Sequence, residues 1–412
     1  MATRDATILL TTRTLRSFSD GFVSVLLASY LAALGFSSLR IGAVATATLL
    51  GTAVATLAVG AIADRAGRRR TLVAATLLAA GTGVAFASAS AFVPILLIAV
   101  VGTLNPSASD VSVFLPVEQA ILPQTVEPAR RTRLFARYNI AGALASAAGA
   151  LFAAVPALLD RWFGWDTLDV LRAMFVLYGA LALVNLAAYQ RLSPAVEPAA
   201  PRRNAPLHRS RGVVFGLSGL FAIDAFAGGF VVQSILALWL FERYGLAVDE
   251  AALIFFVTGI FSSFSFLVAA RVAERIGLIN TMVFTHLPAN VFLILVPLMP
   301  NVALAVVMLL ARSALSQMDV PTRQSYTMAV VDPDERAAAA SVTGVSRSLA
   351  SSGGPVIAGA LLGATTFGWP LVIAGALKIA YDLLLLRRFR NVRPAEELPP
   401  PDDLAAEGVE AS

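Results

Sequence analysis

The chain has 412 residues, of which 58% are hydrophobic and 14% are charged, with a formal net charge of +5 and no cysteine. Soluble domains are about half apolar and about a quarter charged, so this composition excludes an ordinary soluble enzyme. Because cysteine is absent and His208 and His286 are the only histidines, the chain can form neither a disulfide nor a metal site rich in Cys or His. We expect no cofactor and no nucleic-acid partner.

Twelve apolar runs follow one another along the chain, each close to the roughly 20 residues that a membrane-spanning helix needs. They cover residues 15–37, 41–63, 71–89, 92–115, 134–157, 169–190, 212–240, 250–272, 279–299, 301–330, 337–363 and 367–386. We therefore predict an all-α membrane protein with 12 transmembrane helices in two six-helix halves, 1–190 and 212–390. The proline-rich segment 191–211 is predicted to be a cytoplasmic linker, and 391–412 a disordered cytoplasmic tail.

The positions of the arginines predict the orientation in the membrane. They gather in alternate loops and in the tail, namely Arg65, Arg68, Arg69, Arg70, Arg130, Arg131, Arg133, Arg202, Arg203, Arg209, Arg211, Arg271, Arg275, Arg336, Arg387, Arg388, Arg390 and Arg393. By the positive-inside rule, these loops and both termini are cytoplasmic. No cleavage site follows the first apolar run, so we expect it to remain as the first helix. Since Lys378 is the only lysine, the arginine-rich composition suggests a bacterial protein of the plasma (inner) membrane.

An internal repeat relates the two halves. Six residues of the first half match six of the second at a constant separation of 205 positions: Pro116, Gln119, Val126, Glu127, Pro128 and Arg131 against Pro321, Gln324, Val331, Asp332, Pro333 and Arg336. A second match places Asp20 opposite Asp224. Duplicated halves with both termini on one side are typical of transporters in which one half rocks against the other.

The loop between the second and third runs carries the most specific motif. It reads Gly60-Ala-Ile-Ala-Asp64-Arg65-Ala-Gly67-Arg68-Arg69-Arg70 and resembles the loop signature of the major facilitator superfamily. The resemblance implies that a conformational switch, which holds the outward-facing state against the end of helix 11, consists of Gly60, Asp64, Arg65, Gly67 and Arg68. A charged turn that only obeys the positive-inside rule is the alternative. The helix 4 arginine and helix 5 proline that are usual in drug–proton antiporters of this superfamily are absent here.

Ionisable residues within the apolar runs are candidate transport residues, because a charge inside a membrane span usually faces a cavity or a partner. In the superfamily, helices 1, 4, 7 and 10 line the cavity, and here each of these carries a carboxylate: Asp20, Asp110, Asp224 and Asp319. Helix 10 also contains Arg312 and Arg323, on one helical face with Ser316 and Asp319. We expect Asp319 to pair with Arg323. We expect Arg312 to pair with Asp224 across the cavity in at least one transport state.

The other polar residues of the apolar runs are interpreted mainly as structural residues and not as transport residues. Lys378 and Asp382 are four residues apart in helix 12 and are expected to pair along one face. Glu118 is expected to form salt bridges between the halves. His286 is expected to be a packing residue with satisfied polar atoms and not a proton relay. The dipeptide Asn105-Pro106 predicts either a break in helix 4 or a harmless kink.

These features together predict a secondary transporter that moves a small solute across the lipid bilayer by alternating access, coupled to protons, with efflux favoured over uptake. A uniporter, a proton symporter for uptake and a non-transporting receptor on the same scaffold are the alternatives. No ATP-binding loop of the Gly-x4-Gly-Lys-Ser/Thr type is present, and an enzyme is not expected. We expect a monomer. The four carboxylates favour a cationic or polyhydroxylated solute, whereas Arg312 favours an anion.

Overall fold

The computed structural model describes residues 4–107, 112–127, 130–198, 207–332 and 335–390, and all regular elements in these ranges are helical. The candidate residue Asp110 and the predicted tail 391–412 lie outside the described ranges.

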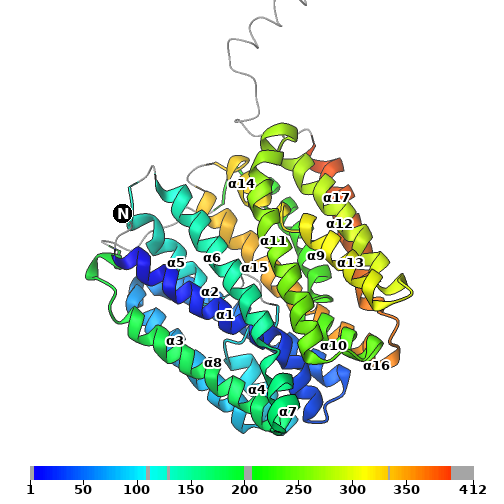
Figure 1. Cartoon of the computed structure of the whole chain (residues 1–412). Helices are drawn as coiled ribbons and strands as arrows, with labels where there is room; N and C mark the ends of the chain where they lie inside the picture. Colours follow the sequence, from blue (N-terminus) through cyan, green and yellow to red (C-terminus); the bar gives the residue numbers. More distant parts are fainter. Residues whose placement is uncertain (1–3, 108–111, 128–129, 199–206, 333–334, 391–412) are drawn as a thin grey trace, which may run out of the picture.

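The helices form two groups that stand side by side (Figure 1). The first group contains α1 (Arg4–Ala33), α2 (Ser38–Ala66), α3 (Arg68–Ser88), α4 (Phe92–Val101), α5 (Leu115–Ile121), α6 (Arg131–Phe152), α7 (Val155–Phe163) and α8 (Thr167–Tyr189). The second contains α9 (Arg211–Gly229), α10 (Gln233–Tyr244), α11 (Val248–Ile276), α12 (Leu278–Leu295), α13 (Val302–Leu315), α14 (Asp319–Ala329), α15 (Arg336–Ser352), α16 (Gly354–Ala364) and α17 (Trp369–Phe389).

Nine helical segments of the described part are long and apolar enough to cross a membrane. They are Ser38–Ala66, Arg68–Ser88, Arg133–Phe163, Thr167–Tyr189, Arg211–Tyr244, Val248–Ile276, Leu278–Leu298, Val302–Ala329 and Trp369–Phe389. The runs predicted at 15–37, 92–115 and 337–363 are not among them. Phe92–Val101 is apolar but has only 10 residues, and the other two runs contain charged and hydroxyl side chains. The helical membrane class is confirmed, and the number of twelve spans stays a prediction.

Proline explains why several predicted spans are interrupted. Pro321 has no N–H to donate and its ring clashes with the carbonyl four residues earlier, so α13 ends at Leu315 and α14 begins only at Asp319. The helix expected from Arg312 to Arg323 is therefore interrupted at residues 316–318, and the shared face of these residues stays a prediction. Helix α4 likewise ends before Asn105-Pro106, so this dipeptide marks a break and not a kink.

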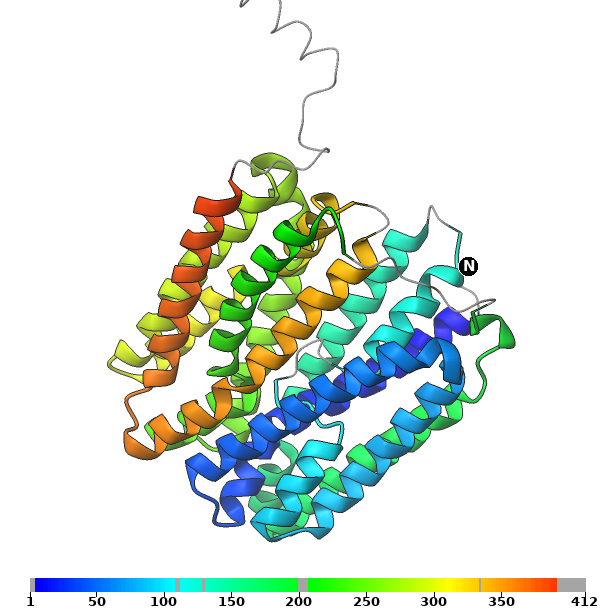
Figure 2. The same ribbon diagram turned by 180° about the vertical axis from the view of Figure 1, so that it is seen from behind.

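The two groups approach each other most closely at one end. In Figure 2, α2 (blue) and α15 (orange) converge at the lower end and diverge towards the upper end. We call the lower end the distal end and the upper end, where the described linker residues 191–198 and 207–210 lie, the linker end. At the distal end Ser38 Oγ donates to Glu242 Oε1 at 2.5 Å, and Arg161 pairs with Asp249 at 2.9 Å. Each of these contacts joins a helix of the first group to one of the second.

Two glycines make the distal contact close. Gly42 of α2 and Gly359 of α16 face each other, and a Cβ atom built on Gly42 would lie 3.1 Å from the Cα of Gly359. A Cβ on Gly359 would overlap the carbonyl oxygen of Ser38. Glycine removes the side chain that would otherwise separate the two backbones, as is usual where membrane helices pack closely.

Candidate functional site

Asp224 of α9 lies at the centre of a buried charged cluster. Its side chain is 4% exposed and accepts hydrogen bonds from Lys378 Nζ at 2.5 Å and from Arg347 Nη1 at 3.1 Å. Arg323 Nη1 lies 3.5 Å from the same carboxylate and His286 Nε2 lies 4.0 Å from it. Side chains from α12, α14, α15 and α17 therefore converge on one residue of α9.

The imidazole of His286 lies between two carboxylates. Its Nδ1 is 2.9 Å from Asp382 Oδ1, while its Nε2 faces Asp224. Asn290, one turn further along α12, donates from Nδ2 to the other oxygen of Asp382 at 3.0 Å. A neutral imidazole carries a single N–H, whereas a protonated one offers an N–H to each carboxylate. The protonation state of His286 thus decides how many hydrogen bonds these carboxylates receive.

Asp319 and Arg323 complete the cluster. Arg323 Nη1 donates to Asp319 Oδ2 at 2.5 Å, one turn along α14, and its guanidinium stacks over the ring of Phe221 at 5.6 Å. The predicted pairing of Asp319 with Arg323 is confirmed. We call the following residues the Asp224 cluster: Asp224, His286, Asp319, Arg323, Arg347, Lys378 and Asp382. It contains three carboxylates and three cations besides the histidine, so its formal charge is zero when the imidazole is neutral.

Arg312 stands apart from these ion pairs. No nitrogen of Arg312 lies within 4.0 Å of a carboxylate oxygen in the described part of the chain, and its buried Nε has no hydrogen-bond partner there. In this state Asp224 binds Lys378, Arg347 and Arg323 instead. The predicted pairing of Arg312 with Asp224 is thus absent here, and for any other transport state it stays a prediction.

The structure corrects one further expectation and adds a residue. Lys378 and Asp382 do not pair with each other, because α17 packs on both α9 and α12 and the two side chains reach different neighbours. His286 is buried and bound to Asp382, as expected of a satisfied packing residue, and a role in proton relay stays untested. Arg347 was not predicted, although an arginine inside an apolar run is the signal that could have identified it.

The first group of helices contains a second buried ion pair. Glu118 of α5 is fully buried and accepts from Arg16 Nη1 at 3.0 Å and Nη2 at 2.6 Å, from the hydroxyl of Tyr189 at 2.6 Å and from that of Tyr138. The predicted role of Glu118 in a bridge between the halves is wrong, because its carboxylate is enclosed by residues of its own group. Its two oxygens are fully used, so this network serves as a structural core. Asp20 is also buried, on α1.

The predicted switch loop binds the linker. Gly67 adopts φ 95°, which allows the sharp turn between α2 and α3, and Asp64 pairs with Arg68 at 2.8 Å. Glu197 of the linker accepts from the backbone N–H of Arg68 at 2.7 Å and of Arg69 at 3.1 Å, at the amino end of α3. An anion at this position is favoured by the helix dipole. The other predicted members, Gly60 and Arg65, do not take part in these contacts.

The far end of the linker binds the second group of helices. Glu335, just before α15, accepts from the backbone N–H groups of His208, Arg209 and Ser210 at 2.7–2.9 Å. Burial alone would raise the pKa of Glu335, but these hydrogen bonds outweigh it and lower the pKa from 4.5 to about 2. Both described ends of the linker are therefore fixed, each to a different group.

We expect Glu335→Gln to loosen the linker at residues 208–210. A carboxylate whose pKa is lowered on folding stabilises the folded contact above its unfolded pKa, and the contribution disappears as the pH falls from 4.5 to about 2. Amide hydrogen exchange at 208–210 should be faster in the variant at neutral pH, and the difference from wild type should vanish over that acidic range. Glu274→Gln, at an exposed carboxylate near the end of α11, is the control. Equal protection of wild type and Glu335→Gln at pH 7 would contradict the assignment.

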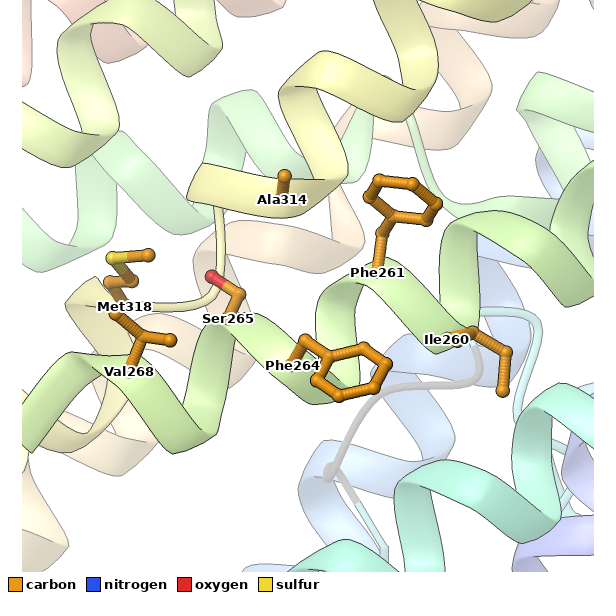
Figure 3. Close-up of a pocket in the computed structure, with 7 residues that line it drawn as sticks. All are labelled: Ile260, Phe261, Phe264, Ser265, Val268, Ala314 and Met318. Carbon is orange, nitrogen blue, oxygen red and sulfur yellow. The ribbon is translucent and has the colours of Figure 1, made fainter.

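An apolar pocket of about 260 Å³ lies between α11 and the end of α13 (Figure 3). Ile260, Phe261, Phe264, Val268, Ala314 and Met318 line it, and Ser265 contributes the single polar side chain. No ionisable group lines this pocket, so the Asp224 cluster, which consists of ionisable side chains, remains the candidate functional site.

Sequence comparison places the chain among membrane transport proteins. Residues 9–355 match the Major Facilitator Superfamily. A relative from Saccharomyces cerevisiae, described as the uncharacterized membrane protein YJR124C, is 24% identical over 95% of each chain.

Solved transporter structures share the fold at low sequence identity. A bacterial homolog of the human lysosomal transporter Spinster, in an inward-facing and occupied conformation, superposes with a TM-score of 0.74 at 18% identity, over 94% of this chain and 97% of its own. A point mutant of the nucleoside transporter NupG gives 0.73 at 14% identity, over 93% and 99%. The D-xylose-proton symporter gives 0.73 at 15% identity, over 93% and 96%.

Proposed function

Because the chain belongs to the Major Facilitator Superfamily, we propose that it is a secondary transporter that carries a small solute across the membrane by alternating access. The observation that carries the proposal is the Asp224 cluster, in which residues of four helices bring six formal charges, and a fifth helix brings His286, into the interior of one helical group. Charges buried in a membrane-spanning bundle are costly and mark solute or ion pathways.

The contacts between the two groups support a rocking motion. They are close at the distal end, through Ser38 with Glu242 and Gly42 with Gly359, whereas α2 and α15 diverge at the linker end. We propose that the linker end faces the cytoplasm, since the arginine-rich loops belong to it, and that this conformation is inward-facing. The two halves, 1–190 and 212–390, would rock about the distal contacts while the linker 191–211 connects them. A plasma-membrane location and a monomeric state complete the proposal.

Proton coupling is proposed to act through His286. Histidine is the side chain that most readily exchanges a proton near neutral pH, and this one lies between Asp224 and Asp382. A proton on the imidazole would add a hydrogen bond to Asp224, which would then hold Lys378 and Arg347 less strongly. Because these cations lie on α17 and α15, a proton could change how the helices of the second group hold together.

Flux into proteoliposomes tests the proposal. Candidate solutes are followed with and without an imposed pH gradient, in both directions, so that efflux by antiport and uptake by symport give opposite dependence on the gradient. Flux that does not depend on the pH gradient would identify a uniporter. Saturable binding of a solute without any flux would identify a receptor and reject the transport proposal.

We expect His286→Gln to remove most of the dependence of flux on an imposed pH gradient. Glutamine can still donate to one carboxylate, so folding should be retained, but it cannot carry a proton. His208→Gln is the matched control, because the backbone N–H of His208 and not its ring binds Glu335. A dependence on the pH gradient that is unchanged in His286→Gln would assign proton coupling to another group.

A further inference from the structure

Two polar side chains at and just before the break between α13 and α14 have a buried atom without a hydrogen-bond partner in the described part of the chain. Arg312 is three residues before the end of α13, and its Nε is buried without an acceptor. Ser316, the first residue of the break, is 8% exposed, and its Oγ also has no partner. Arg312 as a whole is partly buried. An arginine cannot lose its proton under ordinary conditions, so its guanidinium keeps a positive charge that can bind a counter-charge.

The Asp224 cluster cannot supply this counter-charge. Its three carboxylates are already matched by three cations, and Asp224 attracts Arg312 only from beyond salt-bridge distance. Counted together with the cluster, Arg312 leaves a surplus of one positive charge. A site with this balance repels a cationic solute and becomes neutral when one negative charge enters.

Arg347 is the most exposed of the three cations of the Asp224 cluster. Its side chain is 29% exposed, whereas that of Asp224 is 4% exposed, and only Nη1 of Arg347 binds Asp224. A guanidinium has five N–H donors, so Arg347 can serve Asp224 and a ligand at the same time.

We propose that Arg312, with Ser316 and Arg347, binds an anionic group of the transported solute, a carboxylate or a phosphate. The inference rests on the proposed transport function and assigns the substrate class of the same site. Guanidinium groups match planar carboxylates and phosphates through paired N–H donors, and a serine hydroxyl can add a third hydrogen bond. Two of the four carboxylates of the predicted cavity helices, Asp224 and Asp319, are already held in ion pairs and therefore do not favour a cation at this site.

Thermal unfolding of the purified full chain with matched solute pairs tests the proposal. The pairs are xylonate with xylose, benzoate with benzamide, and adenosine monophosphate with adenosine. Each pair compares an anion with its neutral analogue, and the three pairs together distinguish binding of a carboxylate from binding of a phosphate. In at least one pair, the anion should stabilise the wild type at a concentration about tenfold lower than its neutral partner. Arg312→Gln should remove this advantage, and Arg312→Lys should keep part of it because the charge remains. Arg275→Gln, at an exposed arginine, should behave as wild type.

The outcomes separate this inference from the transport proposal. If no anion stabilises the wild type better than its neutral partner, or if the advantage survives in Arg312→Gln, the anion site is refuted. Proteoliposomes that transport xylose or adenosine but not xylonate or adenosine monophosphate would also refute the anion site. That result would leave the transport proposal intact. An anion that stabilises the wild type but is never transported would support the site and refute transport.

Discussion

Replacing Asp224 by asparagine is expected to abolish coupled transport and to destabilise the second group of helices. The carboxylate is the shared partner of Lys378, Arg347 and Arg323. Removing one member of a buried ion pair typically costs about 3–5 kcal/mol, because the remaining charge stays buried without compensation. Lysine can lose its proton in response, but the two arginines cannot. We expect a clear fall in the thermal unfolding temperature and flux at the level of empty liposomes.

A second substitution separates folding from transport in this test. In the double variant Asp224→Asn, Lys378→Met, the remaining carboxylates and arginines are again equal in number, so the unfolding temperature should recover while coupled flux should not. Asp169→Asn, at an exposed carboxylate of α8, is the control. Wild-type flux in the single variant would show that the cluster has no transport role. Failure of the double variant to regain stability would show that Lys378 is not the main uncompensated charge.

Replacing Gly359 by leucine is expected to prevent closure of the distal end and to stop transport without unfolding the protein. Any side chain at this position of α16 would overlap the backbone of α2 at Ser38. Overpacking of this kind costs about 1–3 kcal/mol or more, and about 3 kcal/mol would shift an equilibrium between two states by roughly 100-fold. The penalty applies only to the conformation in which α2 and α16 touch, so the state closed at the linker end should accumulate.

The absence of cysteine allows this shift to be measured directly. A single cysteine at Ser38, where the hydroxyl touches Glu242, should react faster with a membrane-impermeant thiol reagent when Gly359→Leu is also present. Gly363→Leu is the matched control, because the same helix leaves open space around a Cβ at Gly363. Normal flux in Gly359→Leu, or equal labelling in the two leucine variants, would mean that the distal contact does not open during transport.

Local patterns in the sequence were enough to predict the membrane class, most of the spans and one ion pair. Long apolar runs identify spanning helices because every backbone polar group must be satisfied within the bilayer, and nine such helices are present in the described part. Asp319 and Arg323 were paired correctly because residues four apart on a helix are neighbours whatever surrounds them. The motif around Asp64 and Gly67 led to the superfamily for the same reason, since it lies in one short stretch of the chain, residues 60–70.

Contacts between distant segments were decided only by the tertiary structure. The same four-residue spacing gave the wrong partner for Lys378, which binds a carboxylate 154 positions away, and Arg347 meets that carboxylate from 123 positions away. Sequence spacing tells which residues share a helical face, but not which faces of α9, α15 and α17 meet. That choice depends on how whole helices pack, and in a low-dielectric interior a charge binds the best-placed counter-charge of the assembled bundle and not the nearest one along the chain.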